Sequence, residues 1–487
     1  MARVKSRKNR MNRYDISNGQ SIPSRRASSL DALRGYAIMT MILAATEAFG
    51  ILPGWMYHAQ VPPPDHVFNP HIYGITWVDL IFPFFLFSMG AAIPLSLGQQ
   101  LEKGVGKWAL VKKTTVRWLK LSFFAIFVIH VYPYMLGYPA QWMNQAVAIV
   151  AFALMFLLFM PNPFHLSKWG NRTVNTLAYV GAIALILFQP YAEGKPFMLQ
   201  DEDIIMLILA NVSLTGAIIY LLTPQKPVAR LAVIPLLMAF FMSAKTDGSW
   251  QQAVRDFTLA PWLYNVAYQE YLLIIIPGTI AGDLMTRWLR KETTCQTREK
   301  IKWAPFIAIL SLALIVANVV TLYVRTLLAD LLISAVILTA MWVMLAKGNG
   351  EKEYWRKLFL SGAYMLALGL IIEAYEGGIR KDDVTLSYLF VTCGLAFFAL
   401  LFFTIVCDHY HVRWLSKPLE LVGHNPMVAY VSNGLAVIPL LQLCQVYPIM
   451  ANICNMPLMG FLQGVILTGL CMLLTAFFTK RGMYWKT

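Results

Sequence analysis

Three of the chain's eight histidines, His58, His66 and His71, lie in one proline-rich stretch that precedes a very apolar segment. Imidazole titrates near neutral pH and is nucleophilic, so a histidine held in place can act as a general base or carry an acyl group. The run "VPPP" stiffens the stretch. The spacing of the three histidines matches no usual zinc pattern, and no metal site is expected. The alternative is that all three are solvated loop residues.

Asp79 follows these histidines in "GITWVDLIFPFFLFSMG", where a helix is expected to begin. At that position its carboxylate can orient an imidazole and stabilise the charged form, or it can cap the helix beside Thr76. Pro83 lacks an N–H and therefore leaves a backbone carbonyl near Asp79 without its helical partner. These residues favour a catalytic pair made of one loop histidine and Asp79.

The composition predicts an all-α polytopic membrane protein. Of the 487 residues 58% are hydrophobic and only 13% are charged, which excludes an ordinary soluble domain. Apolar runs of about 18–22 residues are long enough to cross a bilayer as helices, and they lack the alternation of barrel strands. We expect a bundle of about 12–14 transmembrane helices, with spans near 31–52, 76–98, 118–136, 142–160, 174–190, 204–222, 231–243, 269–288, 304–323, 327–346, 358–375, 386–406, 421–443 and 457–479.

The positive charges predict the orientation of this bundle. On the map above, all but six of the 40 Lys and Arg residues fall on one side, the exceptions being Lys195, Lys245, Arg255, Arg325, Arg380 and Lys381. The positive-inside rule then places both termini in the cytoplasm and the loop 53–75 outside. The net charge of +15 is read as a topology signal with some attraction to membrane lipid, and no nucleic acid partner is expected.

The expected domain organisation is simple. Residues 1–27 are basic and rich in Ser and Asn, as in a disordered cytoplasmic tail. Residues 28–487 form one transmembrane domain, in a multi-pass protein of the cell inner membrane. The oligomeric state is left open, with a homodimer as one option.

Further polar residues at the expected ends of spans are candidates for binding. On the outer side, amides and carboxylates can hold a polyol or an amine, and the candidates are Asn144, Gln145, Glu270 and Glu373. On the inner side, cations can hold phosphates, and the candidates are Arg34, Lys112, Lys113 and Arg117, although topology alone also predicts basic residues there. Asn425 lies between Gly423 and Pro426, where a broken helix is expected to line a passage.

The run from "SLDALRG" through "MYHA" to "GITWVDLIFPFFLFSMG" resembles the family of heparan-α-glucosaminide N-acetyltransferase and its bacterial relatives. That family pairs a "D-x-x-R-G" first helix with a histidine-bearing loop and a "G-x-T-x-x-D-L-x-F-P" second helix. The strong likeness covers about residues 28–98, and "QWMNQAVAIV", "EYLLIIIPGTIAGDL" and "PLELVGHNPMVAYV" are weaker blocks. "PPPDHVFNPHIY" departs from the pattern as an insertion in the loop.

The resemblance implies transfer of an acetyl group from cytosolic acetyl-CoA to a saccharide amine or hydroxyl outside the cytoplasm. It implies a catalytic histidine in the first outer loop, with His58 in "MYHA" as the best counterpart, His71 next and His66 third. Arg34, Lys112, Lys113 and Arg117 are then candidates for the CoA phosphates, and Asn425 for the passage. The expected acceptor is an amino sugar or oligosaccharide, though the insertion and the larger number of expected helices favour an acceptor different from the family's.

A second function is compatible with the same sequence. A secondary transporter or flippase for a sugar or organic acid would also have many helices, broken helices and polar groups at membrane depth. It would, however, predict an internal repeat, and the sequence has no visible one. It would also leave the histidine-rich loop without a role.

Overall fold

The computed structural model describes residues 27–47, 50–258, 260–292, 301–453 and 456–486; the expected disordered tail lies almost entirely outside them. No strand forms in these ranges, and the all-α expectation is confirmed. The α-helices are α1 Ser28–Thr46, α2 Trp77–Ile93, α3 Gln99–Glu102, α4 Lys107–His130, α5 Gln141–Phe159, α6 Lys168–Phe188, α7 Ile204–Leu222, α8 Pro227–Leu231, α9 Val233–Ser243, α10 Trp250–Asp256, α11 Leu272–Glu292, α12 Ala304–Tyr323, α13 Leu327–Leu345, α14 Glu351–Glu376, α15 Leu386–Phe403, α16 Arg413–Gly423, α17 Pro426–Ser432, α18 Ile438–Leu443, α19 Val446–Ile453 and α20 Pro457–Lys480.

Eleven helices of the described chain are long and apolar enough to cross a membrane. Their bounds are 77–102, 141–159, 168–188, 204–222, 267–290, 304–323, 327–345, 351–376, 386–409, 426–443 and 457–480. The other three expected spans coincide with α1, α4 and the short apolar segment Pro227–Ser243. The first two carry charged residues in their N-terminal halves, and the third is short. The multi-pass architecture is therefore confirmed, and the orientation of the termini stays a prediction.

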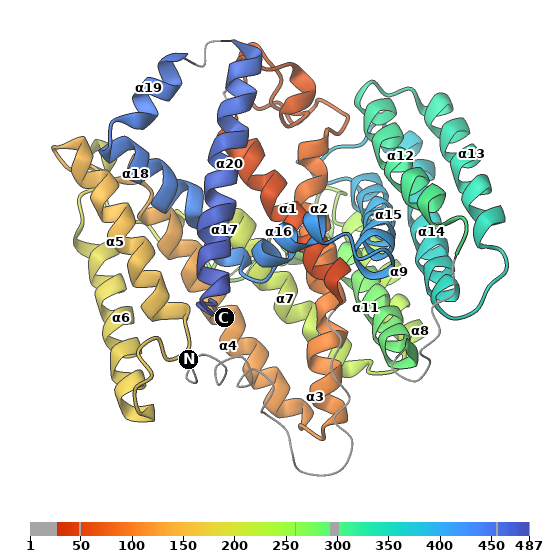
Figure 1. Ribbon diagram of the computed structural model, residues 1–487, viewed down its shortest axis with the longest axis horizontal. Helices are drawn as coiled ribbons and strands as arrows, with labels where there is room; N and C mark the ends of the chain where they lie inside the picture. The colour runs from red at the N-terminus through yellow and green to blue at the C-terminus, as the bar shows by residue number, and fades with distance from the viewer. Residues whose placement is uncertain (1–26, 48–49, 259, 293–300, 454–455, 487) are drawn as a thin grey trace, which may run out of the picture.

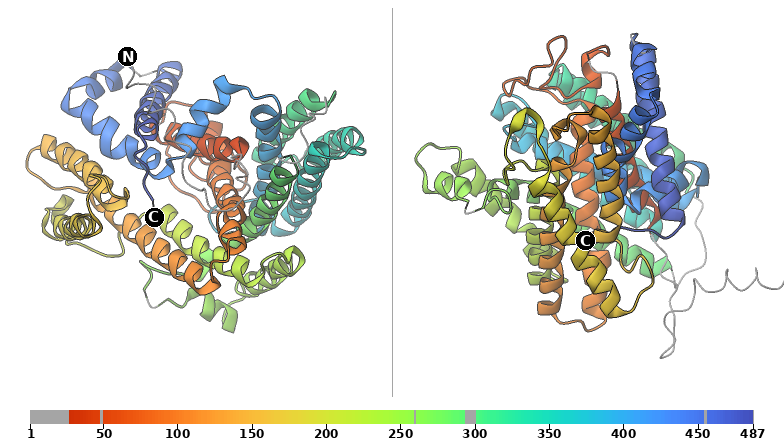
Figure 2. Two further views of the ribbon diagram at one scale, coloured as in Figure 1. Left: turned by 60° about the horizontal axis from the view of Figure 1, so that its bottom comes forward. Right: turned by 90° about the vertical axis from the view of Figure 1, so that its left-hand side faces the viewer.

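The buried centre of the bundle is formed by α2 and α15. Nearly every side chain of α15 is buried, as are those of the first turns of α2. The helices α12, α13 and α14 flank this centre on one side, and α5 and α6 lie on the other (Figure 1). The two further views show that α5 and α6 stay together on the outside, away from α12–α14 (Figure 2). A ligand site on α2 is thus held by the most enclosed part of the fold.

The contact between α2 and α11 depends on glycine. A Cβ added to Gly282 would lie 2.2 Å from the carbonyl oxygen of Ala91, and one on Gly90 would lie 2.5 Å from that of Ile275. Small residues let helix backbones approach closely and gain van der Waals contact in a bilayer. This close approach fixes the position of α2 against α11.

We expect Gly282→Ala to destabilise the protein by about 1–3 kcal/mol, because the new methyl group overlaps a backbone oxygen that cannot move alone. The matched control is Gly181→Ala on α6, where an added Cβ meets nothing within 4 Å. Thermal unfolding in detergent measures both variants. Equal melting temperatures would contradict the requirement for glycine at the contact.

The helix expected to be broken near Gly423 is broken. α16 ends at Gly423, and α17 begins at Pro426. A π-helical turn, Asn433–Val437, then joins α17 to α18. Irregular backbone at membrane depth is tolerated where it lines a cavity, and residues at the start of this turn do so.

Candidate active site

The first turn of α2 holds the carboxylate of Asp79, which is 2% exposed. Its Oδ2 accepts hydrogen bonds from the backbone N–H of Thr76 at 2.9 Å and of Ala59 at 3.2 Å. Asp79 is therefore a helix cap, as one of the two interpretations of the sequence held. The cap uses one oxygen and leaves Oδ1 for another partner.

That partner is His58, whose Nδ1 lies 2.7 Å from Asp79 Oδ1. A carboxylate can only accept in this bond, so we assign a proton to Nδ1; in the neutral ring the lone pair is then on Nε2. Within the described residues Nε2 makes no hydrogen bond, and the side chain is 42% exposed. A neutral imidazole in this tautomer presents a base and nucleophile to whatever lies beside it.

The loop that carries His58 is fastened on both sides of it. Thr76 Oγ1 donates to the carbonyl of Tyr57 at 2.7 Å, which ties the loop to the cap of α2. Gln60 is buried and donates to the carbonyl of Pro70 at 3.2 Å. Hydrogen bonds of this kind restrict the position of the imidazole between them.

Pro83 helps to position Asp79, because it leaves one backbone carbonyl without its helical hydrogen bond. It stands inside α2, so the carbonyl of Asp79 lacks the N–H four residues later. Tyr388 of α15, which is fully buried, donates its hydroxyl to this oxygen at 2.8 Å. The central helix thereby fixes the backbone of the capping residue as well.

A cation completes this end of the site. Lys381 Nζ lies 3.2 Å from His58 Nδ1. It reaches this place because Gln60 binds the backbone of Asp382 twice, at 2.8 Å to the N–H and 3.0 Å to the carbonyl. The positive charge of Lys381 partly balances the carboxylate of Asp79.

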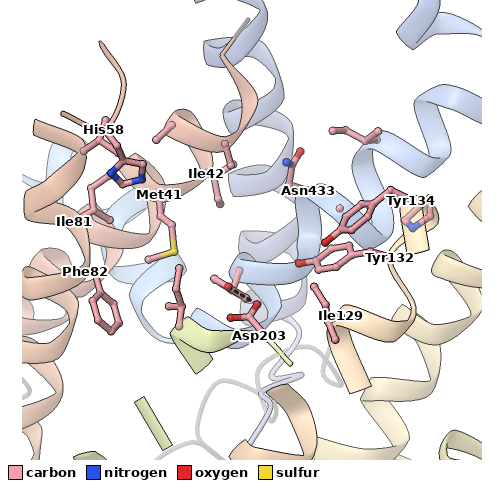
Figure 3. A pocket seen from close by; sticks show the side chains of 18 of the residues that line it. Met41, Ile42, His58, Ile81, Phe82, Ile129, Tyr132, Tyr134, Asp203 and Asn433 are labelled. Carbon is pink, nitrogen blue, oxygen red and sulfur yellow. Dashed lines mark hydrogen bonds between the residues drawn. The ribbon is translucent and has the colours of Figure 1, made fainter. Parts of the chain in front are cut away.

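His58 and Lys381 line a cavity of about 870 Å³, a size typical of small-molecule sites. Its wall is formed by α1, α2, α5, α7, α17, α18, the turn between α17 and α18, the last turn of α4 and the segment after it. In Figure 3 His58 lies on one side of the cavity, while Asp203 and two tyrosines lie across from it. Apolar side chains form much of the remaining wall, including Ile42, Ile81, Phe82, Ile129 and Ile205.

The far end of the cavity is built around Asp203, the residue before α7. Its Oδ1 accepts from the N–H of Met206 at 3.1 Å, and its Oδ2 accepts from the hydroxyl of Tyr430 at 2.6 Å. Burial raises the pKa of Asp203, and the hydrogen bonds from Tyr430 and the α7 backbone oppose that rise. The rings of Tyr132 and Tyr134 stack here, with centroids 5.5 Å apart and planes 14° apart.

Of the four residues predicted to bind substrate on the outer side, two line the cavity and two do not. Asn144 and Gln145 line the cavity, whereas Glu270 and Glu373 do not. Glu373 is fully buried and pairs with Arg325 at 3.1 Å. His71 is exposed in the loop, and it is His58, not His71, that meets Asp79.

The predicted inner residues lie outside the cavity. Arg34 contacts Asp31 and the carbonyl of Ser88, each at 3.5 Å, and Arg117 lies within electrostatic range of Arg34. Lys112 and Lys113 are exposed, with Lys113 donating to Gln100 at 2.9 Å. Asn425 is fully buried and binds the backbone of the C-terminal segment, at Met483 and Trp485.

Two groups of this site were not predicted. Lys381 had one available signal, as one of the six basic residues on the outer side of the predicted topology. Asp203 follows Asp201 and Glu202 in a loop, and nothing in that acidic run singles it out. As for metals, the described residues contain no group of three or more His, Cys, Asp or Glu that could hold an ion.

Comparison with known proteins adds a distant relative. The chain is 34% identical to human (Homo sapiens) heparan-alpha-glucosaminide N-acetyltransferase over 119 residues, which cover 24% of this chain and 15% of that protein. This distant relationship suggests a function of the acyltransferase type. The model of a family described as "Domain of unknown function (DUF5009)" matches residues 26–285, more than half of the 487 residues. The chain therefore belongs to the DUF5009 family.

Proposed function

We propose that the chain is a membrane acetyltransferase that moves an acetyl group from acetyl-CoA to an amine or hydroxyl of a saccharide outside the cytoplasm. The observation that carries the proposal is the His58–Asp79 pair, whose free Nε2 belongs to a side chain lining the cavity. The distant N-acetyltransferase relative supports the same reaction class.

The lone pair of His58 Nε2 serves two possible routes. As a base, it takes the proton of the acceptor while the acceptor's nitrogen or oxygen attacks the thioester carbonyl; the C–S bond breaks, and the proton passes to the leaving CoA sulfur. As a nucleophile, Nε2 attacks the thioester itself, the C–S bond breaks, and CoA leaves as the thiolate; the acceptor then attacks the acetyl-imidazolium, the C–N bond to Nε2 breaks and returns the lone pair to His58, and the proton that the acceptor loses passes to the CoA thiolate. Asp79 stabilises the positive imidazole in either route.

Lys381 has a role in both routes. Attack on a thioester carbonyl places negative charge on its oxygen, and a fixed cation beside His58 stabilises that charge. We expect Lys381→Met to lower kcat about 10²–10³-fold, the usual effect of losing one such group. Lys245→Met is the matched control, because Lys245 is an exposed outer lysine that does not line the cavity. A Lys381→Met enzyme with wild-type kcat would show that the charge is not used.

The acyl donor must reach the cavity from the basic side of the protein. Met41 lines the cavity, and Arg34 lies two helical turns, about 10 Å, further along α1. The flexible pantetheine arm of CoA separates its thioester from its phosphates, so Arg34 and Arg117 suit the phosphates and the cavity suits the acetyl group.

The test uses purified protein in detergent with radiolabelled acetyl-CoA and a panel of amino sugars and oligosaccharides. Release of CoA together with label in the saccharide would support the proposal. Label that stays on the protein when the acceptor is omitted, and is absent from His58→Ala, identifies the acyl-histidine route. No turnover with any acceptor and no binding of acetyl-CoA would overturn the proposal in favour of a transporter or flippase.

A further inference from the structure

The cavity is larger than the reaction at His58 requires, and its far end has its own set of polar groups. Besides Asp203, two carboxamides and two phenols line this end: Gln145, Asn433, Tyr132 and Tyr134. Figure 3 shows the tyrosine rings side by side, with their hydroxyl groups on the side of Asn433 and Asp203. None of these groups takes part in the chemistry proposed for His58.

Asp203 is held ready as an acceptor. The α7 backbone fixes one of its oxygens, and the Tyr430 hydroxyl fixes the other, yet a carboxylate can accept about four hydrogen bonds. It is also the one acidic residue among those lining the cavity in the described chain, and Lys381 is the one Lys or Arg. The two charges stand at opposite ends, so the far end has no cation to balance a ligand's negative charge.

The phenols and amides supply the complementary groups. In the described chain the hydroxyls of Tyr132 and Tyr134 form no hydrogen bond, and neither do the side-chain N–H groups of Gln145 and Asn433. Two paired rings present a flat amphipathic surface, while Ile129 and Ile205 are apolar neighbours. Hydroxyl groups and C–H faces together are the surface of a sugar ring.

We propose that this end of the cavity, centred on Asp203, binds a sugar ring of the acceptor through its hydroxyl or amino groups and selects against rings that carry a negative charge. The inference rests on the proposed function and names its substrate class as neutral or amine-bearing saccharides. Burial disfavours the charge on Asp203, as its raised pKa indicates, and a ligand donor would offset that cost. An anionic group would add repulsion in a partly enclosed site.

The test measures binding directly, without acetyl-CoA, using the full chain in detergent. The two probes are a disaccharide of two glucosamine units and one in which glucuronate replaces the non-reducing glucosamine. For the wild type we expect about 10-fold or tighter binding of the first probe. Asp203→Asn keeps the shape and removes the charge, so we expect it to abolish most of this preference. The matched control, Asp201→Asn, changes a carboxylate in the same loop that does not line the cavity and should leave the preference intact.

Tyr430→Phe gives a second, independent variant. It removes the hydroxyl that holds Asp203, and we expect about 3- to 10-fold weaker binding of the glucosamine probe. Equal binding of the two probes by the wild type would overturn the inference, as would an unchanged preference in folded Asp203→Asn. Binding and acetyl transfer are measured separately. If the protein prefers the glucosamine probe but transfers no acetyl group, this inference is retained and the proposed function is rejected.

Discussion

Replacing His58 with alanine is expected to reduce acetyl transfer by about 10³-fold or more, to a level indistinguishable from the uncatalysed reaction in most assays. The reason is that Nε2 of His58 is the free lone pair that Asp79 orients beside the cavity. His58→Gln is the sharper variant, because it retains a polar side chain that can donate to Asp79 yet cannot take a proton. CoA release from radiolabelled acetyl-CoA measures both variants.

The controls for this prediction are in the same loop. His71→Ala alters an exposed side chain, and His66→Ala alters a ring that packs edge-on against Tyr57 at 4.7 Å. Neither residue lies beside the cavity, and we expect His71→Ala to retain full turnover. Activity lost in His71→Ala and retained in His58→Ala would move the chemistry to His71 and reject the site described above.

The second large effect is expected for Asp79→Asn. This variant should lower kcat about 10²–10⁴-fold and change KM little. The two backbone N–H groups of Thr76 and Ala59 both require an acceptor, so the amide oxygen of the new asparagine must face them. Its NH2 group then faces His58 and forces Nδ1 to accept. The proton moves to Nε2, and the base is lost while the geometry is retained.

Tyr388→Phe is a useful comparison for Asp79→Asn. It removes the donor to the Asp79 carbonyl without changing the carboxylate, so we expect a loss of stability of about 1–3 kcal/mol and a much smaller loss of kcat. The melting temperatures of both variants separate the two effects. If kcat of Asp79→Asn falls only in proportion to the fraction of folded protein, Asp79 acts as a helix cap alone and has no role in catalysis.

The interpretation of Asp79 shows how far sequence reasoning reaches at a single residue. The sequence predicts either capping or the orientation of a histidine, and the structure has both, because the two oxygens of the carboxylate have separate partners. The freed carbonyl near Pro83 was also predictable, since it follows from the chemistry of proline in a helix. That Tyr388, 309 residues away, would bind it was not.

Composition and hydrophobic length predict the class of the protein and the approximate positions of its long helices. Hydrophobic length and helix-breaking residues act locally, so the spans and the broken helix at Gly423 could be predicted. The sequence also placed the candidate histidine near Asp79, because both lie within one short stretch.

Which distant residues share the site depends on how the helices pack, and it could not be predicted from the sequence. Lys381 meets His58 across 323 residues, and Tyr430 meets Asp203 across 227. Glu373 is a carboxylate near the end of a span, as a substrate-binding carboxylate would be, yet it forms an ion pair with Arg325. A residue's type states what it can bind, but its partners depend on how helices rotate and pack. The rotation and packing of each helix depend on the summed contacts of the whole bundle, so they cannot be read from the residue type at any single position.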